Sequence, residues 1–219
     1  MEGTGITWDW NDREILRYLG YRGQELPENI EELIGLCKQD LERAAAPKAI
    51  WREYPLAIQK HELDMTILRT QSRNLERNLK DCSQVIFFAA TLGSQVDVLI
   101  HRYSRLQMSR AVVLQAAAAA MLETYCDEKN TQLKTEYLEK GLYLRPRFSP
   151  GYGDFPLDCQ RPIADALELN KRIGITLTDT LLMAPSKSVT AVIGVSSLPK
   201  DCSVQGCEAC GKKDCLYRR

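Results

Sequence analysis

The sequence lacks the features that mark several large functional classes. It has only 2 histidines in 219 residues, His61 and His101, and they lie too far apart in the chain to suggest a catalytic dyad. It contains no glycine-rich phosphate loop, no serine-nucleophile motif and no internal repeat. Its 29 basic residues balance its 29 acidic ones, so no electrostatic attraction to nucleic acid is indicated. The function has to be sought in shorter patterns.

Export and membrane signals are also missing. The first residues, MEGTGITWDWNDREI, do not combine the basic and apolar regions of a signal peptide. The most apolar helical stretch, residues 111–122, is short, rich in alanine and flanked by Arg110 and Glu123, so we expect a buried helix and no membrane span. We therefore expect a cytoplasmic protein whose 8 cysteines are thiols or metal ligands, since disulfides are rare in a reducing compartment.

Hydrophobic periodicity predicts a mixture of helices and strands. Residues 29–45 repeat apolar side chains at helical spacing after Pro27. Residues 84–90, QVIFFAA, form a continuous apolar run that is typical of a strand covered on both faces. Ser94 is a candidate cap for a long helix reaching about Asp127, with a break near Ser104. The charged residues 128–140 suggest a solvated, mobile connection.

A stiff loop follows at residues 145–152, RPRFSPGY. Pro146 and Pro150 fix φ and bias the residues before them toward extended geometry, and Gly151 permits backbone angles that a Cβ would block. We expect Arg147 and Tyr152 to be the polar tips of this loop. A guanidinium beside an aromatic hydroxyl suits a small ligand with a carboxylate and a flat ring. A plain surface turn is the alternative interpretation.

Beyond this loop the order is helix, strand, hairpin, strand, and residues 145–195 together resemble the activation domain of cobalamin-dependent methionine synthase. The resemblance is fainter upstream and stops after Ser196. The matching residues are Arg147, Pro150, Gly151, Tyr152, Pro156, Gly174, Thr178, Asp179, Met183, Pro185, Ser188 and Val189. The sequence and the resemblance together predict an α+β fold, a twisted and largely antiparallel sheet flanked by helices.

The resemblance also implies a ligand. In that family the loop binds S-adenosylmethionine (AdoMet), and the domain presents it to a cobalamin carried elsewhere. By resemblance, Arg147 should bind the AdoMet carboxylate, while Pro150, Gly151 and Tyr152 should contact its other groups. A helical glutamate at about the place of Glu123 helps to hold AdoMet in the family. Glu123 could equally be an ordinary solvated helix residue.

The last residues have a different character. Cys202, Cys207, Cys210 and Cys215 give the spacing C-x4-C-x2-C-x4-C. Four thiolates this close in sequence can hold one zinc ion or an iron–sulfur cluster. Free or redox-active thiols are the alternative. We therefore divide the chain into an activation-like domain, residues 1–198, and a cysteine-rich tail, residues 199–219.

No cobalamin-binding segment, homocysteine zinc site or folate barrel is recognisable. The resemblance therefore implies a stand-alone reactivation module that binds AdoMet and supports reductive methylation of Co(II) cobalamin. The cobalamin would sit on a separate corrinoid protein, or on a B12-dependent methionine synthase without its own activation domain, with a flavodoxin- or ferredoxin-type electron donor. A conventional AdoMet-dependent methyltransferase would show a glycine-rich strand-to-helix turn, which is not visible. A non-catalytic metal-binding adaptor that has kept only the fold is the main alternative.

Overall fold

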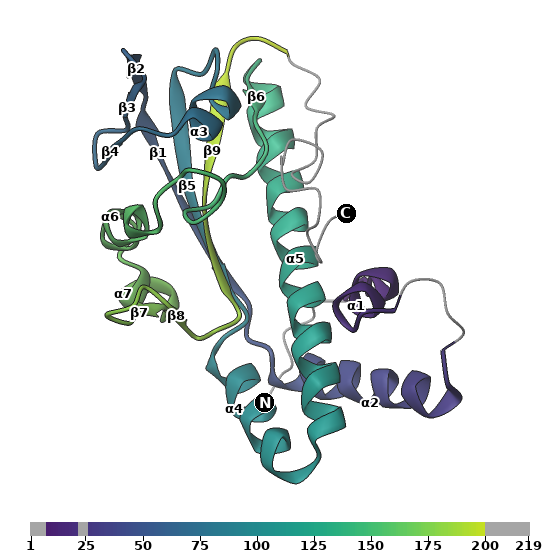
Figure 1. The fold of residues 1–219 in the computed structure, drawn as a ribbon. Helices are drawn as coiled ribbons and strands as arrows, with labels where there is room; N and C mark the ends of the chain where they lie inside the picture. The colour runs from purple at the N-terminus through teal and green to yellow at the C-terminus, as the bar shows by residue number, and fades with distance from the viewer. Residues whose placement is uncertain (1–7, 22–25, 200–219) are drawn as a thin grey trace.

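The computed structural model describes residues 8–21 and 26–199, and Figure 1 shows their arrangement. The helices are α1 (Asp12–Tyr18), α2 (Glu28–Ala44), α3 (Arg73–Asn78), α4 (Ser94–Leu106), α5 (Met108–Glu139), the 3₁₀ helix η1 (Leu157–Cys159), α6 (Gln160–Ala166) and α7 (Leu169–Ile173). The strands are β1 (Lys48–Pro55), β2 (Ala57–Gln59), β3 (Glu62–Asp64), β4 (Arg69–Thr70), β5 (Gln84–Thr91), β6 (Tyr143–Leu144), β7 (Thr176–Leu177), β8 (Met183–Ala184) and β9 (Ser188–Ser196).

The main sheet has the strand order β1-β5-β9-β6, and all of its pairings are antiparallel. The apolar run predicted as a strand is β5, which lies in the interior of the sheet. The alternating run predicted after the hairpin is β9, and its Ile193 lies opposite Ile86 of β5. The predicted α+β fold with a largely antiparallel sheet is confirmed.

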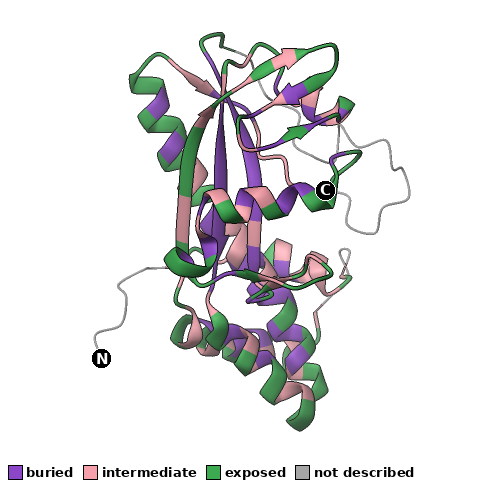
Figure 2. Ribbon diagram, turned by 90° about the vertical axis from the view of Figure 1, so that its left-hand side faces the viewer, coloured by how far each residue is buried: buried purple, intermediate pink, exposed green. Residues whose placement is uncertain are grey.

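Both faces of this sheet are covered, as the buried colour of its two central strands in Figure 2 shows. Val85, Phe87 and Ala89 of β5 belong to a core shared with α3, α6 and α7. The alternate residues Ile86 and Phe88 face the other way, into a core that includes residues of α5. A strand with two buried faces needs apolar side chains at every position, which explains the unbroken run in the sequence.

The long helix α5 joins the sheet to a helical layer. Its N-terminal half packs against α1, α2 and α4 in a third core. Ala116, Ala117 and Ala118 are buried there, and their small side chains allow neighbouring helices to approach closely. The helix continues along the sheet to β6, so α5 carries residues of both layers (Figure 1).

Details of the long helix predicted from Ser94 are corrected. The break expected near Ser104 is present, since α4 ends at Leu106, Gln107 is extended (φ −157°) and α5 begins at Met108, but α5 continues to Glu139, beyond the predicted end at about Asp127. The N-cap of α4 is Gly93 and not Ser94, and no side-chain hydrogen bond caps this helix. Residues 128–140 are not a mobile connection, because they form the end of α5.

The hairpin after Gly174 is also different from the prediction. Thr176–Leu177 pairs with Met183–Ala184 in a separate two-stranded sheet, and the main sheet receives only β9. Within the described residues, no helix is both long enough and apolar enough to cross a membrane.

Candidate functional site

The loop singled out in the sequence leaves the edge of the main sheet. Phe148 exchanges two backbone hydrogen bonds with Val192 of β9, which fixes the chain just before the turn. Gly151 then adopts φ +89°, a left-handed angle that side-chain-bearing residues rarely take. The backbone N–H of Gly151 donates to the carbonyl of Phe155 at 2.8 Å, so the loop closes on itself. Phe155, which is 1% exposed, anchors the far end in the core.

Arg147 does not extend from this loop into solvent. Its Nη2 donates to the Asp127 carboxylate at 2.7 Å and to the Glu123 carboxylate at 3.3 Å. Both acids lie on α5, four residues apart and therefore on one face of the helix. Only 17% of the Arg147 side chain is exposed. Arg147, expected as a polar tip of the loop, is therefore mostly buried against α5.

The groups around Arg147 keep it ionised. Burial opposes the charged guanidinium, but the neighbouring Cys126, Glu123 and Asp127 together outweigh it and raise the pKa of Arg147 above its usual range. The same burial acts on the thiol beside it and raises the pKa of Cys126 to about 12. The site thus has one fixed cation between two carboxylates and a neutral thiol.

The structure brings together only some of the residues proposed for ligand binding. Arg147 and Glu123 are in direct contact. Tyr152 is 68% exposed, and its ring packs edge-on against Phe148 with centroids 6.5 Å apart. Pro150 is buried beneath the turn. The loop therefore presents Tyr152 outward, while Arg147 is directed to α5.

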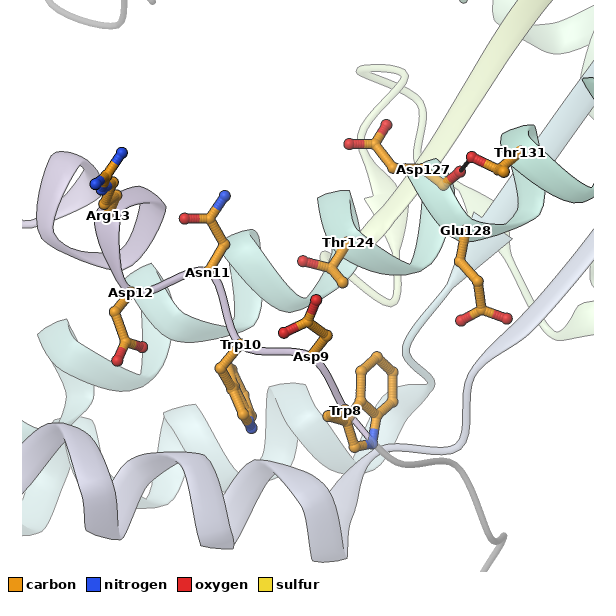
Figure 3. A pocket seen from close by; sticks show the side chains of 10 residues that line it. All are labelled: Trp8, Asp9, Trp10, Asn11, Asp12, Arg13, Thr124, Asp127, Glu128 and Thr131. Carbon is orange, nitrogen blue, oxygen red and sulfur yellow. Dashed lines mark hydrogen bonds between the residues drawn. The ribbon is translucent and has the colours of Figure 1, made fainter.

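A pocket of about 630 Å³ lies between the N-terminal segment, residues 8–13, and the middle of α5 (Figure 3). Asp127 belongs both to this pocket and to the ion pair with Arg147. The lining residues are Trp8, Asp9, Trp10, Asn11, Asp12, Arg13, Thr124, Asp127, Glu128 and Thr131. The pocket is therefore adjacent to the Arg147 cluster.

The pocket combines acids with aromatic rings. Its lining includes four carboxylates and a single arginine, Arg13. Trp10 is held in place by a hydrogen bond from its Nε1 to Glu42 at 2.7 Å, and Trp8 packs against Tyr125 with centroids 6.2 Å apart. Carboxylates beside fixed indole rings favour a cationic ligand with a flat or apolar part.

The N-terminal half of this pocket was not predicted. The run Trp8-Asp9-Trp10-Asn11-Asp12 gives two tryptophans and two acids within five residues, and this density was the available signal. Its position against α5 depends on contacts between distant parts of the chain, which no local pattern shows.

The described residues contain no group of three or more histidine, cysteine, aspartate or glutamate side chains arranged for a metal ion. The predicted metal ligands Cys202, Cys207, Cys210 and Cys215 lie outside the described residues. Of the other cysteines, Cys37, Cys126 and Cys159 are buried and Cys82 is partly exposed, all as free thiols.

Known proteins resemble this chain both in fold and in sequence. A solved structure named "Crystal Structure of the MetH Reactivation Domain bound to AdoHcy" aligns with a TM-score of 0.65 at 14% identity, over 86% of this chain and 76% of that chain. At this identity the match shows the shared fold. A search of curated proteins found no match. Residues 75–209, more than half of the chain, match the family described as "Vitamin B12 dependent methionine synthase, activation domain", and the chain therefore belongs to this family.

Proposed function

We propose that this protein binds AdoMet and supports the reductive methylation of Co(II) cobalamin carried by a separate protein. The observation that carries the proposal is the acidic, tryptophan-lined pocket beside the Arg147 cluster, in a chain of the activation-domain family. The structural neighbour contains AdoHcy, the product that AdoMet becomes after losing its methyl group.

The residues of the pocket fit the charges of AdoMet. Its sulfonium and ammonium groups are cationic, and Asp9, Asp127 and Glu128 supply carboxylates on opposite sides of the pocket. The indole faces of Trp8 and Trp10 suit the adenine ring or the sulfonium. The pocket thus offers partners for each positively charged part of the ligand.

Arg147 would hold the AdoMet carboxylate. Its hydrogen bonds to Glu123 and Asp127 both use Nη2, and a guanidinium has five N–H donors, so it can donate to a further carboxylate. Glu123 would then orient Arg147 and contact the ligand ammonium. Pro150, Gly151 and Tyr152 would shape the wall of the loop on the outer side.

The protein's chemical contribution is positioning. The cobalamin of the partner would supply the nucleophile, and a flavodoxin- or ferredoxin-type donor would supply the electron. The pocket would hold the sulfonium so that its methyl group faces the partner, and the closed loop would keep water away from it. The partner would be a corrinoid protein or a B12-dependent methionine synthase without its own activation domain.

AdoMet affinity is the first test. Isothermal titration calorimetry should detect binding to the full chain, and AdoMet should bind more tightly than AdoHcy, because only AdoMet carries the sulfonium charge. Arg147→Ala should raise the Kd about ten- to hundredfold, since a charge-assisted pair contributes roughly 1.5–3 kcal/mol. Asp158→Ala, which removes an exposed carboxylate of η1, is the matched control and should leave the Kd unchanged.

Function with a partner is the second test. The protein should stimulate AdoMet-dependent recovery of a corrinoid protein poised in the Co(II) state, in the presence of a reductant. Recovery should be lost in Arg147→Ala and kept in Asp158→Ala. Methionine formation by this chain alone would contradict the proposal. A wild-type protein that does not bind AdoMet would instead favour the adaptor that has kept only the fold.

We also propose a metal at the four C-terminal cysteines, Cys202, Cys207, Cys210 and Cys215, because their spacing suits one zinc ion or an iron–sulfur cluster. Metal analysis of anaerobically purified protein should find zinc or iron. A visible absorption band would distinguish the cluster from zinc. Protein containing neither metal would refute this part of the proposal.

A further inference from the structure

The loop proposed to bind AdoMet continues to Asp154. The carboxylate of Asp154 attaches this loop to the start of α3, which lies far away in the sequence. Asp154 Oδ1 accepts a hydrogen bond from the Ser72 hydroxyl at 2.5 Å and from the backbone N–H of Asn74 at 3.1 Å. Asp154 Oδ2 accepts from the backbone N–H of Arg73 at 2.8 Å. Ser72 is the N-cap of α3, and its oxygen also accepts from the N–H of Leu75. A side chain from the loop therefore completes the cap of α3.

The loop approaches α3 closely at Gly153. Gly153, the residue before Asp154, has φ +56°. A Cβ at Gly153 would lie 2.3 Å from Nδ2 of Asn74, so any other residue here would displace the Asn74 side chain and also adopt a left-handed φ. The Ser72 hydrogen bond lowers the pKa of Asp154, so the carboxylate stays ionised and keeps accepting from α3 at neutral pH.

The attachment lies between two other fixed points. Upstream, Phe148 is paired with Val192 of β9, and downstream, Phe155 is buried in the core. Between them, the turn contains hydrogen bonds within itself, such as Tyr152 N–H to the Ser149 carbonyl at 3.1 Å. Such bonds define the shape of the turn but not its position on the protein. The carboxylate of Asp154 supplies that position.

We propose that Asp154 is a positioning residue for AdoMet binding, acting through the loop that runs from Arg147 to Tyr152. The proposal rests on the proposed function, because it needs the loop to contact AdoMet. No contact joins Asp154 to Arg147 or Glu123 among the described residues, so its effect has to pass through the backbone. Two residues before Asp154, the ring of Tyr152 packs edge-on against Phe148, so a shift of the turn would move this ring.

Removing this carboxylate should weaken AdoMet binding more than it weakens the fold. Asp154 is exposed on its outer side, so water can replace part of what the helix amides lose. Phe155 and the Phe148 pairing keep the ends of the loop in place. Asp154→Ala should therefore raise the Kd for AdoMet about tenfold, which corresponds to about 1.4 kcal/mol. Asp154→Asn keeps one acceptor oxygen and should give an intermediate Kd.

The experiment measures three quantities on the full chain: the Kd for AdoMet by calorimetry, the melting temperature, and hydrogen exchange of the amides of residues 149–155 without ligand. Asp158→Ala removes another exposed acid nearby and should change none of them. Ile100→Val trims the helical core and should lower the melting temperature while leaving the Kd unchanged. It separates a loss of positioning from a general loss of stability.

The expected result is that Asp154→Ala speeds hydrogen exchange of the loop amides. It should also raise the Kd for AdoMet well beyond the Kd of any variant with a similar melting temperature. Wild-type affinity in Asp154→Ala would overturn this inference and leave the proposed function standing. An increase in Kd no larger than that of an equally destabilised Ile100→Val would overturn it as well. Absence of AdoMet binding by the wild type would overturn both proposals.

Discussion

At the scale of single residues, the cluster around Arg147 joins two residues that the sequence analysis selected separately. Arg147 and Glu123 were each predicted to touch a ligand, from a resemblance that concerns bound AdoMet. The structure shows that they touch each other, with Asp127 as a third member. Asp127 could not be selected from sequence, because its significance depends on the loop lying against one face of α5.

This cluster predicts a measurable coupling. A double-mutant cycle with Arg147→Met and Asp127→Asn should give a coupling free energy of about 0.5–1 kcal/mol in urea unfolding, because the Asp127 side chain is largely exposed. The exposed pair Lys140–Glu136 near the end of the same helix is the control, with a coupling of about 0.5 kcal/mol or less. Equal coupling free energies in the two pairs would show that the burial of Arg147 does not strengthen its ion pair with Asp127.

Buried thiols give a second prediction at this scale. Burial raises the pKa of Cys126 to about 12 and that of Cys37 to about 11. Since the thiolate is the reactive form, both should resist alkylation at pH 8 in the folded protein. Peptide mass mapping after iodoacetamide treatment should find them unmodified, with Cys82 labelled faster, and all three labelled in denaturant. Rapid labelling of native Cys126 would contradict its burial.

At the scale of elements, strongly periodic segments were predictable and boundaries were not. The apolar run of β5 and the stripe of α2 follow from their burial on two faces and one face, respectively. The end of α5 was missed because its surface is highly charged. Cys126, Leu133 and Tyr137 lie seven and four residues apart, all buried, and this sparse stripe was the available helical signal.

The contact between the loop and α3 gives a prediction for these two elements. Gly153→Ala should destabilise the protein by about 1–2 kcal/mol, because it adds both left-handed strain and a contact with Asn74. Gly141→Ala meets the same strain at φ +70° with open space around it, and should cost less. Adding Asn74→Ala to Gly153→Ala should recover part of the loss in thermal unfolding. If stability does not recover, the contact with Asn74 is not what destabilises Gly153→Ala.

At the scale of the whole molecule, α5 connects the two halves of the site. Its N-terminal half packs in the helical core, while Glu123, Asp127 and Glu128 reach the pocket and the loop farther along. The family and the fold could be predicted from residues 145–195. The pocket could not, because it forms only where segment 8–13 meets α5, and these two parts are far apart in the chain.

The three tryptophans allow this arrangement to be tested in solution. Trp8 and Trp10 line the pocket, whereas Trp51 lies on the edge strand β1, 41% exposed. If AdoMet occupies the pocket, its adenine ring should quench the indole fluorescence of the first two. Trp51→Phe should therefore keep a saturable quenching signal with the wild-type Kd, and the double variant Trp8→Phe/Trp10→Phe should lose most of it. A signal that disappears with Trp51→Phe would place the ligand elsewhere on the molecule.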